Sequence, residues 1–195
     1  KKRVGRILQK EANYTIQDDD KDNIILNSLP EARMRTDYLS WDDYFMAAAF
    51  LTAKRSKDPN TQVGACIVNT NRRIVGMGYN GFPRGCSDDV LPWDRKSKGG
   101  ELFTKYPYVC HAEVNAILNK SSADVSGATI YVALFPCNEC AKMIIQAGLR
   151  EVVFLNDTYH ETDSCRASRI MFEMSGIKLR QYSPTINTIT LNLAS

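Results

Sequence analysis

The sequence predicts an α/β fold in which helices cover both faces of a mixed or parallel sheet. Short, uninterrupted apolar runs are typical of buried strands, and other segments place apolar residues at helical spacing. The two kinds of segment alternate along the second half of the chain, which is the pattern of a sheet between two layers of helices. A chain of 195 residues fits one compact domain that buries about 70% of its unfolded surface.

The first expected elements are a helix and a hairpin. Ser40 has the side chain of an N-cap, and aromatic and aliphatic residues follow it at helical spacing to about Lys54. Two apolar runs, 63–68 and 74–79, are separated by a polar turn and predict a hairpin of two buried strands.

A long loop follows the hairpin. Residues 81–107 are rich in Gly, Pro, Asp and Lys, and loops of this length are usually functional or mobile. The basic residues of this loop and Trp93 could reach a ligand. The alternative is a solvated loop that packs on a neighbouring subunit.

From Cys110 onward, helices and strands alternate regularly. The tail, in which Ile189, Leu191 and Leu193 alternate with polar residues, predicts one more, half-buried edge strand. The other expected helices cover about 110–120, 137–147 and 163–175, and the expected strands cover 129–133, 151–155 and 177–182.

The first 36 residues carry no sustained periodicity, so we interpret 1–36 as an N-terminal extension to a domain that spans 37–195. This extension is either a surface arm or a segment that contacts other subunits. The six cysteines are scattered, without the density of a disulfide-stabilised miniprotein, which predicts a reducing, cytosolic location. No apolar run approaches the roughly 20 residues of a membrane span, so no membrane partner is expected.

The charge balance argues against a dedicated nucleic-acid binder. The 25 basic residues are nearly offset by 22 acidic ones, and the net charge is only +3. Nucleic-acid binding requires a concentrated basic field. The composition therefore favours a small anionic ligand.

The most informative motif is His111-Ala112-Glu113, followed by a Cys-x-x-Cys pair at Cys137 and Cys140. Two cysteines three residues apart project from one face of a helix's first turn. A histidine from a second helix completes three protein ligands and leaves the fourth tetrahedral position of a zinc ion for water, as in catalytic sites. Cys-x-x-Cys alone is also compatible with a redox pair or half of a structural zinc site, but the upstream His-x-Glu favours catalysis.

The expected chemistry divides between the metal and Glu113. The positive end of a helix dipole favours the thiolates that zinc requires. Bound zinc lowers the pKa of its water to about 7. Glu113 would take that proton and carry it to a ring nitrogen and then to a departing amino group.

The remaining cysteines and the second histidine are not expected to bind metal. His160 falls in a loop without a cysteine pair, which favours a surface or substrate-loop role over a metal ligand. Cys66 lies in a buried strand and is expected to be an inert core thiol. Cys110 should point away from its neighbour His111, and Cys86 and Cys165 are expected to be free thiols.

Four segments, two of which contain the metal motif, resemble the zinc-dependent cytidine and deoxycytidylate deaminase family, in particular its eukaryotic deoxycytidylate deaminases. The resemblance begins at about Tyr38 and covers the chain into its C-terminal region. The segments that carry it are 55–66, 78–81, 105–113 and 133–141.

This resemblance implies a three-layer α/β/α sandwich around a mixed five-stranded sheet. It also implies hydrolysis of dCMP to dUMP and ammonia, which supplies dUMP for thymidylate synthesis, with one catalytic Zn²⁺ per subunit of a homohexamer. dCTP would activate and dTTP would inhibit, each with Mg²⁺. A second zinc site, found in some viral relatives, is not expected because this chain has only two histidines.

The resemblance also assigns roles at the site. His111, Cys137 and Cys140 match the zinc ligands, and Glu113 matches the proton shuttle. The backbone N–H of Ala112 would meet the pyrimidine carbonyl.

For the rest of the substrate, Asn80 is expected to hold the sugar hydroxyl, and Asn80 and Gly81 belong to a segment associated with effector binding. Tyr159 could stack on the base or flank the phosphate, or be an ordinary exposed tyrosine. Four residues, Arg55, Ser56, Lys57 and Asn60, complete the expected substrate contacts, and the first three would receive the phosphate unless they form a solvated helix end.

Two other functions could also use a zinc site of this kind. A deaminase acting on single-stranded DNA or RNA needs a basic groove with interleaved aromatic residues, which the balanced charge does not favour. A catalytically inactive, zinc-stabilised binding module would be expected to have lost the shuttle carboxylate, but Glu113 is present.

Overall fold

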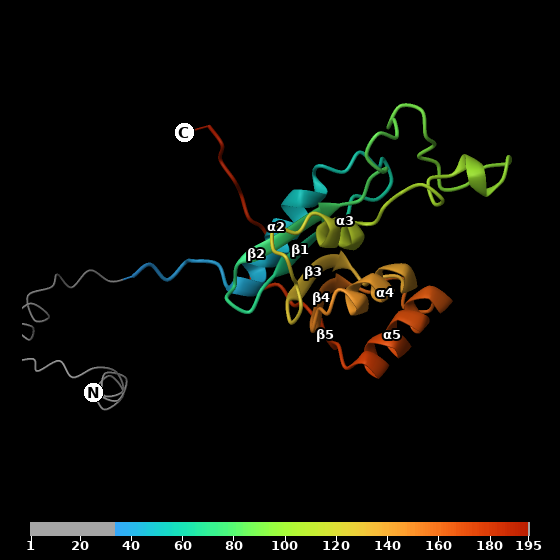
Figure 1. Cartoon of the computed structure of the whole chain (residues 1–195). Coiled ribbons are helices and arrows are strands. Elements are labelled where there is room, and N and C mark those ends of the chain that lie inside the picture. The colour runs from blue at the N-terminus through green and yellow to red at the C-terminus, as the bar shows by residue number, and fades with distance from the viewer. Residues whose placement is uncertain (1–33, 195) are drawn as a thin grey trace, which may run out of the picture. The chain divides into compact units, whose positions relative to one another are not determined.

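The structure is a computed structural model that describes residues 34–194 (Figure 1). Within this range, residues 39–194 form one compact unit. The predicted extension, 1–36, lies outside the described residues except for 34–36, so its role stays a prediction. Within the described part of the chain, no helix is both long and apolar enough to cross a bilayer.

Five strands form one mixed sheet in the order β2-β1-β3-β4-β5. β1 pairs with both β2 and β3 in antiparallel orientation, whereas β3, β4 and β5 are parallel. The predicted mixed five-stranded sheet is confirmed. The strands are β1 (Gly64–Val68), β2 (Ile74–Tyr79), β3 (Thr129–Leu134), β4 (Glu151–Asn156) and β5 (Lys178–Gln181).

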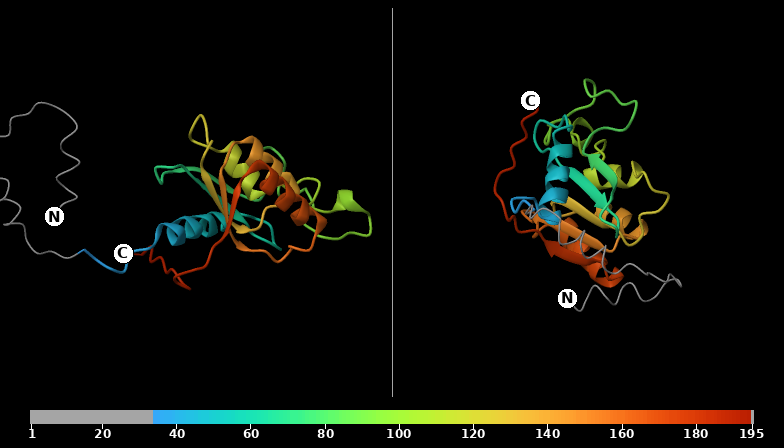
Figure 2. Two further views of the ribbon diagram at one scale, coloured as in Figure 1. Left: turned by 90° about the horizontal axis from the view of Figure 1, so that it is seen from below. Right: turned by 90° about the vertical axis from the view of Figure 1, so that its left-hand side faces the viewer.

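Helices cover both faces of this sheet, as predicted (Figure 2). α2 lies on one face, and α3, α4 and α5 lie on the other. Side chains alternate between the two faces along each strand, so each strand contributes to both layers of the core. Cys66 and Val153 pack with Phe45 of α2, whereas Ile67 and Val152 pack towards the other three helices. The helices are α2 (Trp41–Ala53), α3 (Ala112–Leu118), α4 (Asn138–Gln146) and α5 (Asp163–Ser175), with a 3-10 helix η1 (Glu101–Phe103) in the long loop.

The edge strand predicted for the tail is wrong. After β5, Asp43 of α2 accepts hydrogen bonds from the hydroxyls of Tyr182 and Thr185, which redirects the chain onto α2. An apolar cavity of about 590 Å³ lies between α2 and the tail, with Ile189 and Leu191 in its wall. Ile189 and Leu191 therefore face a helix and not a neighbouring strand, whereas Leu193 is exposed.

α3 packs unusually closely on β2, and this contact positions the site. A Cβ on Gly78 would lie 2.2 Å from the backbone N of Ala116 and 2.3 Å from the carbonyl oxygen of Ala112. Only glycine permits this approach of two backbones. The close contact brings the first turn of α3 beside the end of β2.

The long loop between β2 and α3 is tied to its own domain. Trp93 packs on Phe82, with ring centroids 4.0 Å apart, and its indole N–H donates to the Asp88 carbonyl at 3.0 Å. Near the end of the loop, the ammonium of Lys105 forms a buried ion pair with Asp58. The two contacts of Trp93 lie within the loop, and the ion pair of Lys105 fixes the end of the loop to the segment before β1.

Candidate active site

Three side chains that could bind a metal converge at one point. The nitrogen and sulfur ligand atoms of His111, Cys137 and Cys140 all lie within 4.8 Å of one another. The Nδ1 atom of His111 is 3.4 Å from Sγ of Cys137 and 3.3 Å from Sγ of Cys140. Ligands at ordinary Zn–S and Zn–N distances in a tetrahedron lie about 3.6 Å apart. The spacing and the donor set therefore fit zinc.

Two helix N-termini supply these ligands. His111 is the N-cap of α3 and Cys137 is the N-cap of α4, and neither side chain caps its own helix. Both side chains are thus free to face each other. The positive ends of two helix dipoles point at the same place, which favours anionic thiolates there.

The thiol and imidazole groups are strongly coupled. A hydrogen bond from Cys140, together with His111, lowers the pKa of Cys137 to about 4. A hydrogen bond to Cys137 raises the pKa of His111 to about 9, and the pKa of Cys140 is raised by its hydrogen bond to Cys137 and by burial. Because zinc binds thiolates and neutral imidazole, a metal that binds here displaces protons from the ligands.

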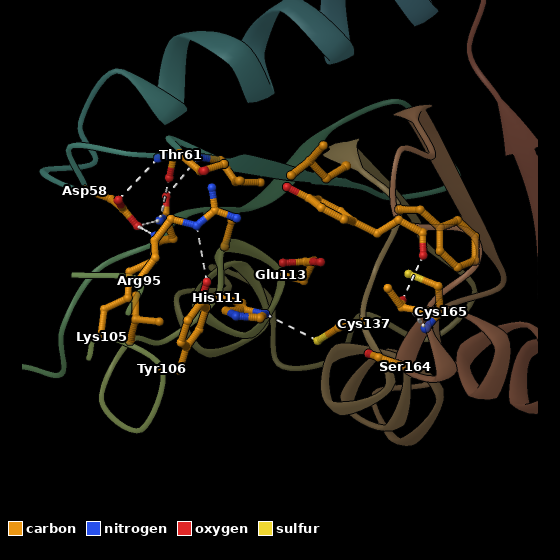
Figure 3. A pocket seen from close by; sticks show the side chains of 18 residues that line it. Asp58, Thr61, Arg95, Lys105, Tyr106, His111, Glu113, Cys137, Ser164 and Cys165 are labelled. Atoms are coloured by element: carbon orange, nitrogen blue, oxygen red, sulfur yellow. Dashed lines mark hydrogen bonds and ion pairs between the residues drawn. The ribbon is translucent and has the colours of Figure 1, made fainter. Parts of the chain in front are cut away.

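Glu113 lies beside this group and is 5% exposed (Figure 3). Burial raises the pKa of its carboxyl group, and the positive charge of His111 opposes this rise only in part. A carboxyl group with a raised pKa can both accept and return a proton near neutral pH. Glu113 therefore has the environment of an acid–base group.

The end of β2 is joined directly to the start of α3. The backbones of Gly81 and Cys110 exchange two hydrogen bonds, with N···O distances of 3.1 and 2.8 Å. The amide of Asn115, one turn into α3, donates to the Tyr79 carbonyl at 2.8 Å. His111 thus follows directly after a residue that is fixed to the sheet.

A cavity of about 350 Å³ opens over these residues (Figure 3). Its volume is in the range of small-molecule sites. Its wall combines the metal-binding end with residues of the long loop and of the segment before α5. The lining residues are Asp58, Thr61, Val63, Asn80, Arg95, Lys105, Tyr106, Val109, His111, Ala112, Glu113, Leu134, Phe135, Cys137, Tyr159, Thr162, Ser164 and Cys165.

Asn80 lies in the cavity wall with most of its hydrogen-bonding capacity already used. Its Oδ1 accepts from the Val63 N–H at 2.8 Å, and its Nδ2 donates to Asp58 at 3.2 Å and to the Thr61 carbonyl at 3.0 Å. One lone pair of Oδ1 remains for a ligand. Asn80 can therefore accept a hydrogen bond from a hydroxyl group but has no donor left to offer.

Asp58 and Lys105 form a buried polar centre behind Asn80. Their side chains are 1% and 7% exposed. Burial acts to raise the pKa of Asp58, but hydrogen bonds from Lys105 and from the backbone N–H groups of Asn60 and Thr61 outweigh it and lower the pKa. The pair joins the segment before β1 to the long loop.

The structure brings some of the predicted substrate residues to the cavity and leaves others outside it. Asn80, Ala112 and Tyr159 line the cavity. Four do not line it, namely Arg55, Ser56, Lys57 and Asn60. The ammonium of Lys57 pairs with Asp88 at 2.5 Å, and the Ser56 hydroxyl donates to the Asn80 carbonyl at 2.8 Å.

Several polar residues of the cavity wall were not predicted individually, and three of them come from the long loop: Arg95, Lys105 and Tyr106. All three belong to the long loop or its end, which has no periodicity to show where a side chain points. The only sequence signal was the presence of basic residues in a loop beside the metal motif.

The other sulfur and imidazole groups take no part in the metal group. Cys66 is fully buried, and burial raises the pKa of its thiol to about 12, as expected for an inert core residue. His160 is exposed, and its Nε2 lies 3.1 Å from a carboxylate oxygen of Glu161. Within residues 34–194, the only group that could hold a metal is the His/Cys/Cys group, and all six cysteines are free thiols.

Residues 39–156 match the family model of the cytidine and deoxycytidylate deaminase zinc-binding region. The chain is 60% identical over 163 residues to deoxycytidylate deaminase from Homo sapiens, covering 84% of this chain and 91% of the relative. It is 52% identical over 171 residues to a probable deoxycytidylate deaminase from Drosophila melanogaster, covering 86% and 84% of the two chains.

A solved structure is similar as well. The dCMP deaminase from the cyanophage S-TIM5, in complex with dCMP and dUMP, aligns with a TM-score of 0.59 and 28% identity. The alignment covers 77% of this chain and all of the phage chain. The matched segments include the whole His/Cys/Cys group and Glu113, and the chain therefore belongs to the cytidine and deoxycytidylate deaminase family.

Proposed function

We propose that this protein is an enzyme that hydrolyses dCMP to dUMP and ammonia with the help of a zinc ion. The observation that carries the proposal is the arrangement of one buried carboxyl group beside three zinc-type ligands in a cavity of about 350 Å³. The identity of 60% with a deoxycytidylate deaminase supports the choice of substrate.

His111, Cys137 and Cys140 would hold the zinc, and three protein ligands are the number typical of catalytic zinc sites, in which water or substrate is the fourth ligand. When bound, zinc lowers the pKa of a water molecule to about 7 and so makes a nucleophile available near neutral pH.

Glu113 carries the protons. It accepts one proton from the attacking water, passes it to the ring nitrogen next to the amino-bearing carbon, and then assists transfer of a proton to the departing amino group, which leaves as ammonia. The balance is one dCMP and one water consumed for one dUMP and one ammonia formed. The carboxyl group ends the cycle in its starting state.

One backbone group and two side chains position the nucleotide. Ala112 opens α3, where backbone N–H groups lack partners within the helix, so its N–H donates to the pyrimidine carbonyl. The free lone pair of Asn80 accepts a sugar hydroxyl. Tyr159, 46% exposed at the cavity, flanks the base or the phosphate.

The function is tested by measuring ammonia release from zinc-loaded protein with dCMP, deoxycytidine, cytidine and single-stranded DNA. We expect dCMP to exceed deoxycytidine in kcat/KM by at least about tenfold, because a phosphate adds charge-assisted hydrogen bonds that a nucleoside lacks. Equal use of dCMP and deoxycytidine would contradict a phosphate site. Preference for single-stranded DNA would support a polynucleotide deaminase instead.

We further propose regulation and assembly: dCTP activates and dTTP inhibits, each as an Mg²⁺ complex, in a homohexamer. The effector would act near Asn80 and Gly81. The backbone of Gly81 is hydrogen-bonded to that of Cys110, the residue before His111. A displacement of Gly81 would therefore be transmitted to a zinc ligand through one peptide unit. α2 exposes Trp41, Tyr44 and Leu51, which supplies apolar surface for subunit contacts.

Saturation curves for dCMP, on protein of measured oligomeric state, test the regulation. A coupling of about 1–3 kcal/mol would raise the affinity for dCMP about 5- to 150-fold with dCTP and lower it correspondingly with dTTP. Hyperbolic curves that neither effector moves would show an unregulated enzyme.

We also propose a cytosolic location, where the product dUMP serves thymidylate synthesis. All six cysteines are unpaired, which suits a reducing compartment.

A further inference from the structure

We propose that Arg95 determines specificity for a nucleotide over a nucleoside by binding the substrate phosphate at the loop side of the cavity. This inference rests on the proposed function, in which a deoxycytidine ring lies over Glu113. It assigns the phosphate to the long loop, outside the segment that contains Arg55 and Lys57.

The cavity wall offers two cationic side chains besides His111, and they differ in their availability. Lys105 is 6% exposed and is paired with Asp58, so most of its charge is already neutralised. Arg95 is exposed, and no carboxylate among residues 34–194 lies within ion-pair distance of it. Arg95 is therefore the cation at this cavity that can receive an anion without first giving up a partner.

A neighbouring hydroxyl group, that of Tyr106, holds the Arg95 guanidinium in place. Its Nε donates to the hydroxyl of Tyr106 at 3.3 Å, which leaves its terminal nitrogens directed into the cavity (Figure 3). The hydrogen bond to Tyr106 and the proximity of Tyr159 raise the pKa of Arg95. A guanidinium presents a planar fork of donors that matches a phosphate, and the two tyrosine hydroxyls can add donors to the same group.

The order of groups along the cavity matches the order of groups in a nucleotide. Glu113 and the zinc ligands define where the base reacts. Asn80, which would accept a hydrogen bond from a sugar hydroxyl, is itself hydrogen-bonded to Asp58. Figure 3 shows Asp58 and Arg95 on the same side of the cavity, away from Cys137. A 5′-phosphate lies beyond the sugar from the base and so points towards Arg95.

The experiment measures binding of the product dUMP and of deoxyuridine to zinc-loaded protein by isothermal titration calorimetry, directly for dUMP and by displacement for deoxyuridine. The variant is Arg95→Gln. Its matched control is Lys96→Gln, which removes the same charge from the next residue, whose exposed side chain does not line the cavity. Lys57→Gln tests the competing phosphate site.

We expect Arg95→Gln to weaken dUMP binding by about 10- to 100-fold, the loss typical of hydrogen bonds to a charged group, and to change deoxyuridine binding by less than about twofold. Arg95→Lys should recover part of the loss, because it restores the charge but not the fork. Lys96→Gln and Lys57→Gln should leave both ligands unchanged.

Three outcomes would overturn the proposal. Equal weakening of dUMP and deoxyuridine would mean that Arg95 only supports the loop, an unchanged dUMP affinity would place the phosphate elsewhere, and a selective loss in Lys57→Gln would favour the other segment. Ammonia release from dCMP by the same wild-type preparation tests the reaction separately. A wild type that binds dUMP through Arg95 but releases no ammonia would contradict the proposed function and retain the role of Arg95.

Discussion

Replacing Glu113 by glutamine is expected to lower kcat for dCMP by about 10²- to 10⁴-fold, the contribution typical of a general acid–base group. Glutamine keeps the size of the buried side chain but cannot cycle a proton. The three zinc ligands are untouched, so zinc content should stay at the wild-type level. Steady-state ammonia release, paired with elemental analysis of the same samples, measures both quantities.

Two control variants separate this effect from loss of metal and from a general effect of charge. Glu139→Gln removes an exposed carboxylate in the first turn of α4 and should retain full activity, because Glu139 faces solvent and does not line the cavity. Cys137→Ala should lose zinc together with activity and some stability, since metal binding is linked to folding. Glu113→Gln protein that contains zinc and works at the wild-type rate would rule out Glu113 as the shuttle.

Replacing Lys105 by methionine is expected to lower the free energy of unfolding by about 3–5 kcal/mol, the usual cost of removing one partner of a buried ion pair. The substitution leaves the carboxylate of Asp58 buried without its counterion. Urea denaturation, monitored by circular dichroism, measures the change.

The double variant Asp58→Asn/Lys105→Met removes both charges and should recover part of that loss, because contacting residues are not additive. Lys57→Met provides the surface comparison. It breaks an ion pair with Asp88 in which the Lys57 side chain is 63% exposed, and it should change stability little. If Lys105→Met and Lys57→Met lowered the free energy of unfolding by similar amounts, burial of the Lys105–Asp58 pair would not explain the effect of Lys105→Met.

The sequence predicted the metal-binding end of the site well because its signal is local. Spacing within one helix turn fixes the Cys137 and Cys140 pair, and His111 and Glu113 lie two residues apart. The positions of β1 to β4 were also predictable, since buried strands show as apolar runs.

The substrate end was less predictable because it depends on contacts between distant parts of the chain. Asp58 and Lys105 are 47 residues apart and meet only when the long loop folds back. Arg95 reaches the cavity from the same loop, where no pattern gives the direction of a side chain. The prediction of an edge strand in the tail was wrong for a different reason. Alternating apolar residues are compatible with an extended segment that packs on a helix as well as with a strand of a sheet.

The close packing of Gly78 against α3 has a mechanical consequence for the site. Backbone atoms in van der Waals contact resist displacement far more than the ends of long side chains do, and packed interiors have low compressibility. We therefore expect the end of the cavity that holds His111 and Glu113 to be stiffer than the end that holds Arg95, which is carried by an exposed loop. This difference in stiffness would keep the reacting atoms in a fixed position and let the loop adjust to the rest of the ligand.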